Sequence, residues 1–383
     1  MRRTARGDRL GTKREAQGHW LRACSDVGRA RDHNEDAFVV ADLATASPIA
    51  FQQDYTDTPG DHGAMFMVAD GMGGAAAGEI ASSMAVDVVL RELQTRWVGS
   101  SSNEPDVFAK TLVSATSAAN ERIHLFAKEH PEYRGMGTTA TIAGILGDTL
   151  YIAQVGDSRA YLIRNGLARQ LTKDQSLMQR LIEAGEITAE EAEVSERRNI
   201  ILQALGPEAI VKVDITHQQL RRGDTLVLCS DGLSGLVRDR EIAQAVLEEP
   251  DLRSVCLRLI AEANERGGPD NITVVAAQFD GPGLSDAEES DQVGHQIFPV
   301  PDLEPPTDPV APTPVATADA TQPEPGAPAI PPPPKRPGRT NTLEIAPPRH
   351  LDTPSAIRVP RLFPLILAAI AVIILIVYLM RVR

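Results

Sequence analysis

Six short apolar runs dominate residues 20–280, and each has the length of a buried strand. They read GAMFMVAD, TATIAGIL, TLYIAQVG, SRAYLIRNG, DTLVLCSDG and NITVVAAQF. Short polar turns separate neighbouring runs at residues 147–148 and 164–166. Because turns this short join antiparallel strands, the sequence predicts sheets that are largely antiparallel and not doubly wound.

Four longer segments carry apolar residues at spacings of three and four, which is typical of helices with one buried face. They cover residues 79–97, 106–129, about 239–249 and about 252–266. The first two follow one strand and precede a series of hairpins, and the last two are adjacent in the chain. This order predicts an α+β fold in layers, with an antiparallel β-sandwich flanked by helices.

The composition of the 383 residues, 42% apolar and 23% charged, is that of a globular protein with room for a large core. A formal net charge of -14 opposes binding to nucleic acid. The basic arm at residues 1–19 is too short and too poor in aromatic residues to reverse this, and we expect it to be disordered. Cys24, Cys229 and Cys256 show no CxxC spacing, which favours reduced, buried thiols.

The composition changes at about residue 281, and residues 281–360 are rich in Pro, Ala, Thr and Asp without an apolar period. We predict a disordered linker there. The uncharged stretch Leu362–Met380 then has about the length needed to cross a hydrocarbon core. We predict a single-pass membrane anchor at residues 361–383. Because the N-terminus lacks the apolar segment of a secretory signal, the folded part, residues 20–280, is expected in the cytoplasm.

Acidic residues stand at the ends of these apolar runs. Asp70 and Asp231 close two runs, Asp157 follows a third and Asp270 precedes a fourth, while Glu35 and Asp36 come just before another expected strand. One Asp-Gly pair taken alone is most often a turn. Five such placements are much harder to explain as turns, because acids at strand ends repel one another unless a cation neutralises them. The pattern predicts a shared metal site.

Oxygen ligands narrow the choice of metal to Mg²⁺ or Mn²⁺, since no histidine has the spacing of a zinc site. The stretch VADGMGGAAAGE, residues 68–79, adds glycines directly after Asp70. Without a side chain, Gly71 could turn its carbonyl oxygen toward an ion beside the Asp70 carboxylate, and the later glycines would let the backbone pass close by.

Seven motifs occur together, in order, over residues 20–280. They are RARDHNEDAF, VADGMGGAAAGEIAS, GTTATIAGI, AQVGDSRAYLIRNG, LTKDQSLMQRLIEAGEI, LVLCSDGLSGLV and GGPDNITVV. In this set and spacing the chain resembles the bacterial type of the metal-dependent protein serine/threonine phosphatases of type 2C, the PPM family. The resemblance implies a four-layer α-β-β-α sandwich with two Mn²⁺ or Mg²⁺ ions at one end of the sheets.

The resemblance also implies roles for single residues. Asp70 would bridge both ions, Asp231 and Asp270 would complete one, and the Gly71 carbonyl would serve the other. Glu35 and Asp36 match the family's acidic pair, which acts mainly through metal-bound water.

Two further residues match the motifs at a distance from these ligands. Asp157 matches a ligand of a third, weaker ion. Arg31 matches the arginine that grips the substrate phosphate, and a bidentate pose suits its guanidinium; a solvated surface arginine beside Asp32 is the alternative. Arg31, Asp70 and Asp231 are thus the candidate catalytic residues.

The implied activity is metal-dependent hydrolysis of phosphoserine and phosphothreonine in proteins, by a water activated between two divalent ions. Expected partners are phosphorylated proteins, including Ser/Thr kinases at the same membrane, and the catalytic domain is expected to be monomeric. Two alternatives stay open: a pseudophosphatase that binds phosphoproteins or a kinase, and a phosphatase specialised for an anti-sigma antagonist.

The chain departs from the family pattern at two places. Met72 stands where many eukaryotic relatives have the His that is their proposed general acid, and no motif assigns that role to His62. Gln175 stands in a DQS triplet where bacterial relatives usually have DHS, which bears on substrate recognition and metal-site dynamics and not on the metal ligands.

Overall fold

The computed structural model describes residues 17–43, 47–48, 55–57, 62–73, 77–100, 102–195 and 197–300. The predicted linker beyond residue 300 and the predicted anchor at residues 361–383 lie outside this part of the chain. Among the described residues, no helix is long and apolar enough to cross a membrane.

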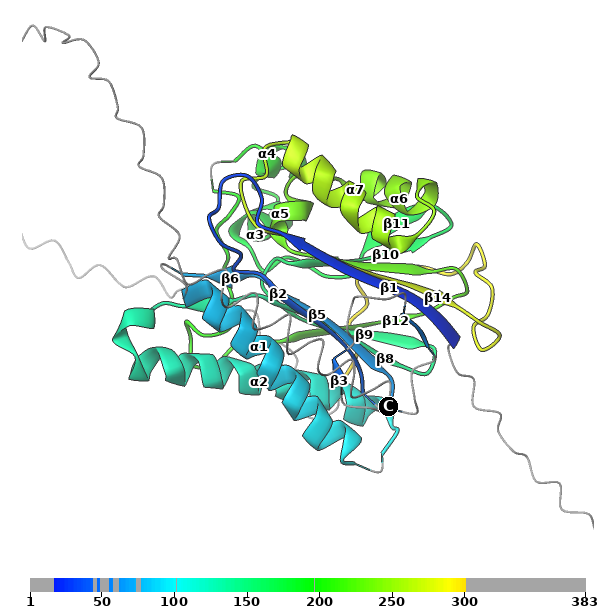
Figure 1. Cartoon of the computed structure of the whole chain (residues 1–383), viewed down its shortest axis with the longest axis horizontal. Helices are drawn as coiled ribbons and strands as arrows, with labels where there is room; N and C mark the ends of the chain where they lie inside the picture. The colour runs from blue at the N-terminus through cyan, green and yellow to red at the C-terminus, as the bar shows by residue number, and fades with distance from the viewer. Residues whose placement is uncertain are drawn as a thin grey trace, which may run out of the picture. The chain divides into compact units, whose positions relative to one another are not determined.

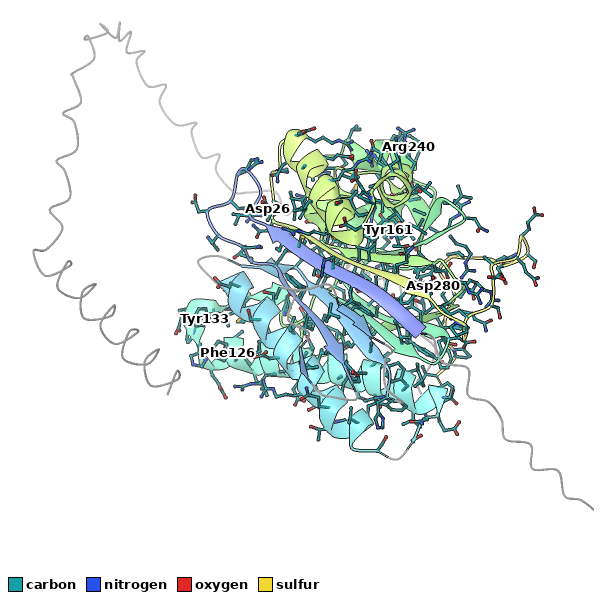
Figure 2. The ribbon with its side chains drawn as sticks, turned by 45° about the vertical axis from the view of Figure 1, so that its right-hand side comes forward. Asp26, Phe126, Tyr133, Tyr161, Arg240 and Asp280 are labelled. Carbon is teal, nitrogen blue, oxygen red and sulfur yellow. The ribbon has the colours of Figure 1, made fainter. Side chains whose placement is uncertain are left out.

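The first of two six-stranded sheets has the order β11-β10-β13-β14-β1-β4, with all neighbours antiparallel. Its strands are β1 (Gln17–Asp26), β4 (Tyr55–Asp57), β10 (Arg159–Arg164), β11 (Leu167–Gln170), β13 (Thr225–Cys229) and β14 (Ile272–Asp280). Asp26 and Asp280 mark opposite ends of the long β1–β14 pair (Figure 2).

The second sheet has the order β12-β9-β8-β5-β2-β3 and is antiparallel throughout. It consists of β2 (Ala37–Asp42), β3 (Ser47–Pro48), β5 (Ala64–Ala69), β8 (Ala140–Leu146), β9 (Thr149–Val155) and β12 (Asp214–Gln219). A small separate pair joins β6 (Gly71–Met72) to β7 (Gly137–Thr138).

Helices cover the outer face of each sheet (Figure 1). The second sheet is covered by α1 (Ala77–Leu93), which continues as a π-helical turn η1 (Gln94–Val98), and by α2 (Pro105–Glu129), which leads into the 3₁₀ turn η2 (Pro131–Tyr133). The first sheet is covered by α5 (Asp231–Ser234), α6 (Asp239–Glu248) and α7 (Leu252–Glu265). Two short helices, α3 (Leu177–Glu183) and α4 (Ala189–Glu193), lie in the connection between β11 and β12.

Strand β5 shows how the sequence builds these layers. Its side chains alternate between the two faces of the sheet, so that Phe66 and Val68 enter the core between the sheets, whereas Met65 and Met67 pack under α1 and α2. Both faces are therefore buried, which explains why the run is continuously apolar. The antiparallel sandwich with helices on both outer faces, predicted from the apolar runs, is confirmed in the described residues.

The predicted hairpin turns are also confirmed. Asn165 and Gly166, between β10 and β11, have φ angles of 52° and 77°. Positive φ at both central positions is the geometry of the tight turn that matches the twist of antiparallel strands, and Asn-Gly adopts it at low cost.

Residues 281–300 form no helix or long strand, yet they pack on the second sheet. The Phe298 amide donates to the Ile215 carbonyl at 2.9 Å, and the Phe298 ring meets the Tyr151 ring edge-on at a centroid distance of 5.2 Å. Val300 belongs to the buried core under α1 and α2. Packing therefore continues to residue 300, beyond the boundary at residue 281 where the composition changes.

A buried ion pair ties the far end of the first sheet, where β10 ends and β13 begins. Arg164 donates to both Asp224 oxygens at 2.8 and 2.6 Å, and the two side chains are 5% and 1% exposed. We expect Asp224→Ala to lower the free energy of unfolding by about 3–5 kcal/mol, because it leaves a buried guanidinium without its counter-charge. Urea denaturation measures this change. Asp286→Ala, at an 81% exposed acid paired with Arg222, is the control and should cost under about 1 kcal/mol.

Candidate active site

The strand registers bring the predicted acids to one end of the sandwich. In the second sheet, Ala37 pairs with Ala69, Val68 with Thr141 and Ala140 with Val155. Asp36, Asp70 and Asp157 therefore lie at the same end of the strands of that sheet. In the first sheet, the pairing of Cys229 with Val274 places Asp231 and Asp270 at one end of the strands. This end carries β6 and lies at the left in Figure 1.

Hydrogen bonds between the two sheets join these strand ends into one site. Ser230 and Thr273 of the first sheet donate to Asp36 Oδ2 of the second at 2.8 and 2.7 Å. The Glu35 amide donates to the Asn271 side-chain oxygen at 2.8 Å. The other sheet therefore fixes the positions of Glu35 and Asp36.

Asn271 holds the loop that precedes β2. Its side-chain amide donates to the carbonyl oxygens of Val27 and His33 at 2.9 and 3.0 Å, in addition to its bond with Glu35. The sequence predicted a role in the site for Asp270 and none for its neighbour Asn271, although Asn271 shapes the loop that carries Arg31.

Four aspartates at this end are buried near one another, and this raises their pKa values. Burial, aided by the charges of Asp231 and Asp270, raises the pKa of Asp36 to about 7. Burial and the Asp231 charge raise the pKa of Asp157 to about 8. Burial also raises the pKa of Asp70 well above its usual range, with the charge of Asp36 the next largest cause, and burial raises the pKa of Asp231.

The opposite end of the sandwich shows a contrasting arrangement of the same residue types. There, Asp224 is paired with Arg164, and Asp291 with Arg221 at 2.7 Å. At the acid end, Arg31 forms ion pairs with Asp270 at 2.7 Å and with Glu35 at 3.7 Å. The Arg31 side chain is 46% exposed, so its guanidinium is accessible to a ligand from solvent.

Two glycines allow the backbone to approach Glu35 closely. A Cβ atom on Gly71 would lie 2.3 Å from the Gly78 carbonyl oxygen and 2.5 Å from the Glu35 carbonyl oxygen. A Cβ atom on Gly78 would lie 2.8 Å from Glu35 Oε1. Gly71 and Gly78 are thus required where β6, the start of α1 and the Glu35 loop meet. That the Gly71 carbonyl serves an ion stays a prediction.

Asp157 sits in a turn that hydroxyl and amide groups brace. Thr139 Oγ1 accepts from the Asp70 amide at 2.9 Å and shares a 2.7 Å hydrogen bond with Ser158 Oγ, which links the Asp70 and Asp157 turns. Gln175 accepts from the Gly156 amide at 2.9 Å and donates to Asp214 at 2.9 Å. The glutamine of the unusual DQS triplet therefore holds the Asp157 turn against the segment that leads to β12.

The acid end has the donor chemistry of a divalent cation site. Among the described residues, Asp36 Oδ1 and Asp157 Oδ1 are buried without a hydrogen-bond partner, which leaves two oxygens available for a cation. Within the same part of the chain, no three acidic, histidine or cysteine side chains converge closely enough to enclose an ion by themselves.

His62 and Met72 are placed differently with respect to the acids. His62 precedes β5, so it lies at the end of that strand opposite Asp70, and its carbonyl oxygen accepts from Trp97. This placement separates His62 from the acids. Met72 pairs with Gly137 in the small sheet directly beside Asp70.

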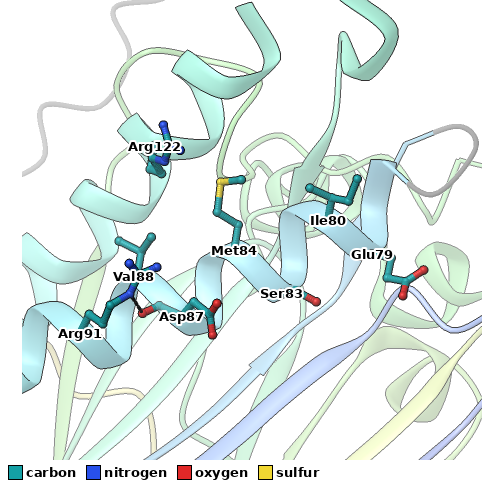
Figure 3. Close-up of a pocket in the computed structure, with 8 residues that line it drawn as sticks. All are labelled: Glu79, Ile80, Ser83, Met84, Asp87, Val88, Arg91 and Arg122. Carbon is teal, nitrogen blue, oxygen red and sulfur yellow. Dashed lines mark hydrogen bonds between the residues drawn. The ribbon is translucent and has the colours of Figure 1, made fainter. Parts of the chain in front are cut away.

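A groove of about 480 Å³ lies elsewhere, along the outer side of α1 and against α2 (Figure 3). Its apolar floor comes from Ile80, Met84 and Val88, and its charged lining from Glu79, Asp87, Arg91 and Arg122. None of the predicted site residues lines it, so it is separate from the acid cluster.

Comparisons with known proteins agree with this geometry. The family model described as Protein phosphatase 2C matches residues 49–268. The serine/threonine phosphatase stp of Listeria monocytogenes is 38% identical over 256 residues, which are 67% of this chain and 94% of that protein. The serine/threonine protein phosphatase PstP of Mycobacterium tuberculosis is 42% identical over 214 residues, 56% of this chain and 40% of that protein.

Solved structures show the same architecture. The crystal structure of the Mycobacterium tuberculosis phosphatase PstP/Ppp superposes with a TM-score of 0.57 at 35% identity, covering 69% of this chain and all of that one. The PstP catalytic domain in complex with two manganese ions gives 0.56 at 35% identity, with coverages of 69% and 99%. Stp1 from Staphylococcus aureus gives 0.59 at 32% identity, with coverages of 73% and 100%.

Proposed function

The chain belongs to the protein phosphatase 2C family and is a serine/threonine protein phosphatase, and from this premise we propose how its own residues carry out the reaction. The proposed reaction is hydrolysis of phosphoserine and phosphothreonine in proteins at the acid end of the sandwich, with two divalent ions. One observation carries the proposal. Four aspartates from two sheets, Asp36, Asp70, Asp157 and Asp231, lie at one end, and among the described residues none of them forms the arginine ion pair that acids have at the other end.

Mn²⁺ or Mg²⁺ fits the oxygen donors at this end. We assign Asp70 to both ions, Asp231 and Asp270 to one, and Gly71 to the other, with Glu35 and Asp36 acting mainly through water. Asp157 would serve a third, weaker ion. When bound, such ions neutralise the phosphate and lower the pKa of water. The complex of the PstP catalytic domain with two manganese ions supports the choice of metal and the number of ions.

The chain's own groups orient these ligands. Ser230 and Thr273 both bond Asp36 Oδ2, which leaves Oδ1 directed to the site without a protein partner among the described residues. Thr138 and the Thr139 amide donate to the Asp70 carbonyl at 2.9 Å, so the backbone that presents the Asp70 carboxylate is fixed. Preorganisation of this kind reduces the cost of gathering like charges around an ion.

Arg31 is positioned to hold the phosphate. Its bond to Asp270 keeps the guanidinium at the edge of the acid cluster, and its half-exposed side chain presents donors to solvent. A planar guanidinium binds two oxygens of a phosphate at once, which orients the group for displacement from the opposite side.

Substitution of Arg31 tests this role. We expect Arg31→Ala to lower kcat/KM for a phosphothreonine peptide by about 10- to 100-fold, mainly through KM, since a charge-assisted hydrogen bond is worth about 1.5–3 kcal/mol. Arg31→Lys should recover only part, because an ammonium group cannot bind in bidentate fashion. Arg29→Ala, in the same loop, is the control. Equal losses in Arg29→Ala and Arg31→Ala would contradict phosphate binding by Arg31.

Hydrolysis assays on the full chain test the activity itself. Purified protein is given p-nitrophenyl phosphate or a phosphothreonine peptide, with Mn²⁺, with Mg²⁺ or with EDTA. We expect turnover of both compounds that requires a metal. Folded protein that binds the phosphopeptide without turnover under any of these conditions would instead support the alternative, a pseudophosphatase that recognises phosphoproteins.

We also propose that Leu362–Met380 anchors the enzyme in the cell membrane, with the catalytic part in the cytoplasm and membrane-bound Ser/Thr kinases among its substrates. The apolar stretch and the Pro-rich residues before it support this proposal. Deleting residues 361–383 should move the protein from the membrane to the soluble fraction and leave turnover of p-nitrophenyl phosphate unchanged. Dephosphorylation of membrane-bound kinases in cells should fall. Full-length protein in the soluble fraction would contradict the anchor.

A further inference from the structure

Two cysteine thiols meet where β1 packs under α7. Along β1, Leu21 and Ala23 face the core between the sheets, whereas Cys24 packs on the other side, against the core that contains Cys256 of α7. The side chains of Cys24 and Cys256 interact with each other across the contact between β1 and α7. Neither belongs to the candidate active site. Two sulfurs in contact on separate elements need little backbone movement to form a bond.

The two thiols differ in character. The hydrogen bond from Cys256, assisted by the positive charges of Arg253 and Arg22, lowers the pKa of Cys24 to about 7. The same hydrogen bond, together with burial, raises the pKa of Cys256 well above its usual range. Cys24 is only partly buried. A partly exposed thiolate beside a protonated, buried thiol is the arrangement of an attacking and a resolving cysteine.

We propose that Cys24 and Cys256 form an oxidisable dithiol, which a peroxide converts into an intramolecular disulfide between β1 and α7. The Cys24 thiolate attacks a peroxide oxygen, the O–O bond breaks, and Cys24 becomes a sulfenic acid. The leaving oxygen departs as hydroxide, which becomes water by taking up the proton that the Cys24 thiol released when it ionised. Cys256 sulfur then attacks the Cys24 sulfur, the S–O bond breaks, and the oxygen leaves as a second water with the Cys256 proton. Two thiols and one hydrogen peroxide thus give one disulfide and two waters, and the peroxide receives both electrons.

Cys229 provides an internal control. It lies on β13 in the same core, is fully buried, and burial raises its pKa to about 12. Buried thiols of this kind are inert toward oxidants and alkylating agents. Reduced, folded full-length protein should therefore react with iodoacetamide at Cys24 at least about tenfold faster than at Cys229.

Peptide mapping tests the disulfide directly. Reduced full-length protein is treated with a small molar excess of hydrogen peroxide, unfolded, alkylated and digested with trypsin without reduction. We expect the peptides ACSDVGR and SVCLR, residues 23–29 and 254–258, to be joined, and Cys229 to be alkylated. Cys229→Ser should give the same joined peptides. Cys256→Ser should stop at a Cys24 sulfenic acid that dimedone labels.

Other outcomes would overturn the proposal. Three alkylated cysteines after peroxide, or a disulfide that joins two chains, would show that the pair does not close within one molecule. Equal sulfenic acid labelling of Cys24 in the unmodified protein and in Cys256→Ser would show that Cys256 does not resolve the intermediate. The first measurement needs no variant, so the proposal can be tested even where a serine substitution impairs folding.

Discussion

Asp70→Asn and Asp231→Asn are each expected to lower kcat/KM toward p-nitrophenyl phosphate by at least about a thousandfold, because each removes a charge needed to hold a divalent ion. The asparagine amide has nearly the shape of the carboxylate, so the effect isolates charge. The Asp70 backbone is held by Thr138 and Thr139 independently of the side chain, and the turn should persist. Initial rates at increasing Mn²⁺ concentration measure both the loss of activity and the loss of metal affinity.

Two features of this experiment separate loss of the metal from loss of the fold. In the absence of metal, both variants should be more resistant to urea than the unmodified protein, since each removes one member of a crowded set of acids. Asp87→Asn, on the exposed side of α1 away from the site, makes the same charge change and should leave turnover unchanged. Retention of more than a tenth of the activity in Asp70→Asn would contradict the role assigned to Asp70.

The parts of the fold that could be predicted from sequence are the elements in which packing determines the positions of the apolar residues. The run that forms β5 is apolar at every position because both of its faces are covered. Strand β12, with the sequence DITHQQ, was not predicted, since its two ends and His217 are polar and only the register with β9 shows it to be a strand. The packing of residues 281–300 depends on single contacts such as Phe298 with Tyr151, which leave no period in the sequence.

The acids of the site could be selected from sequence because each follows or precedes an apolar run, and strand ends are visible. Their meeting at one end is a matter of register between distant strands, which composition does not reveal. Ser230, Asn271 and Thr273 stand within three residues of the chosen acids, yet single hydroxyl and amide residues have no distinguishing pattern in the sequence. Their roles became visible only through the bonds that they form across the two sheets.

The contrast between the two ends of the sandwich indicates which end performs chemistry. Aspartates at the far end have arginine partners and stabilise the fold. The aspartates at the near end raise one another's pKa values, which is a cost to the fold without a cation. A cluster of acids that lowers the stability of the fold, and that residues of two sheets hold in place, is typical of a functional site.

This cost predicts how the stability of the metal-free protein depends on pH. The pKa values of Asp36 and Asp157, about 7 and about 8, lie above the 3.8 of an unperturbed aspartate, so the folded state binds more protons than the unfolded state in this range. Their contribution to stability is therefore complete below about pH 4 and is lost as the pH rises through 7 and 8. We expect the free energy of unfolding to fall by on the order of 5 kcal/mol between about pH 5.5 and pH 8.5, since each unit of pKa difference is worth about 1.4 kcal/mol.

Urea denaturation of the protein in EDTA, at pH values across this range, measures how the free energy of unfolding changes with pH. Addition of Mn²⁺ at the alkaline end should restore the lost stability, because an ion takes the place of the protons. Cys24, whose pKa is lowered to about 7, adds stability as the pH rises, so the slope is measured in proteins that carry Cys24→Ser. Surface ion pairs do not contribute in this range. Acids such as Glu241, whose pKa is lowered to about 2 by Arg266, complete their titration below about pH 5.5 in both states. Asp157→Asn should flatten the slope, since an amide has no proton to lose. A slope that is unchanged in Asp157→Asn, or stability that rises with pH in the chelated protein, would show that the acid cluster does not impose this cost.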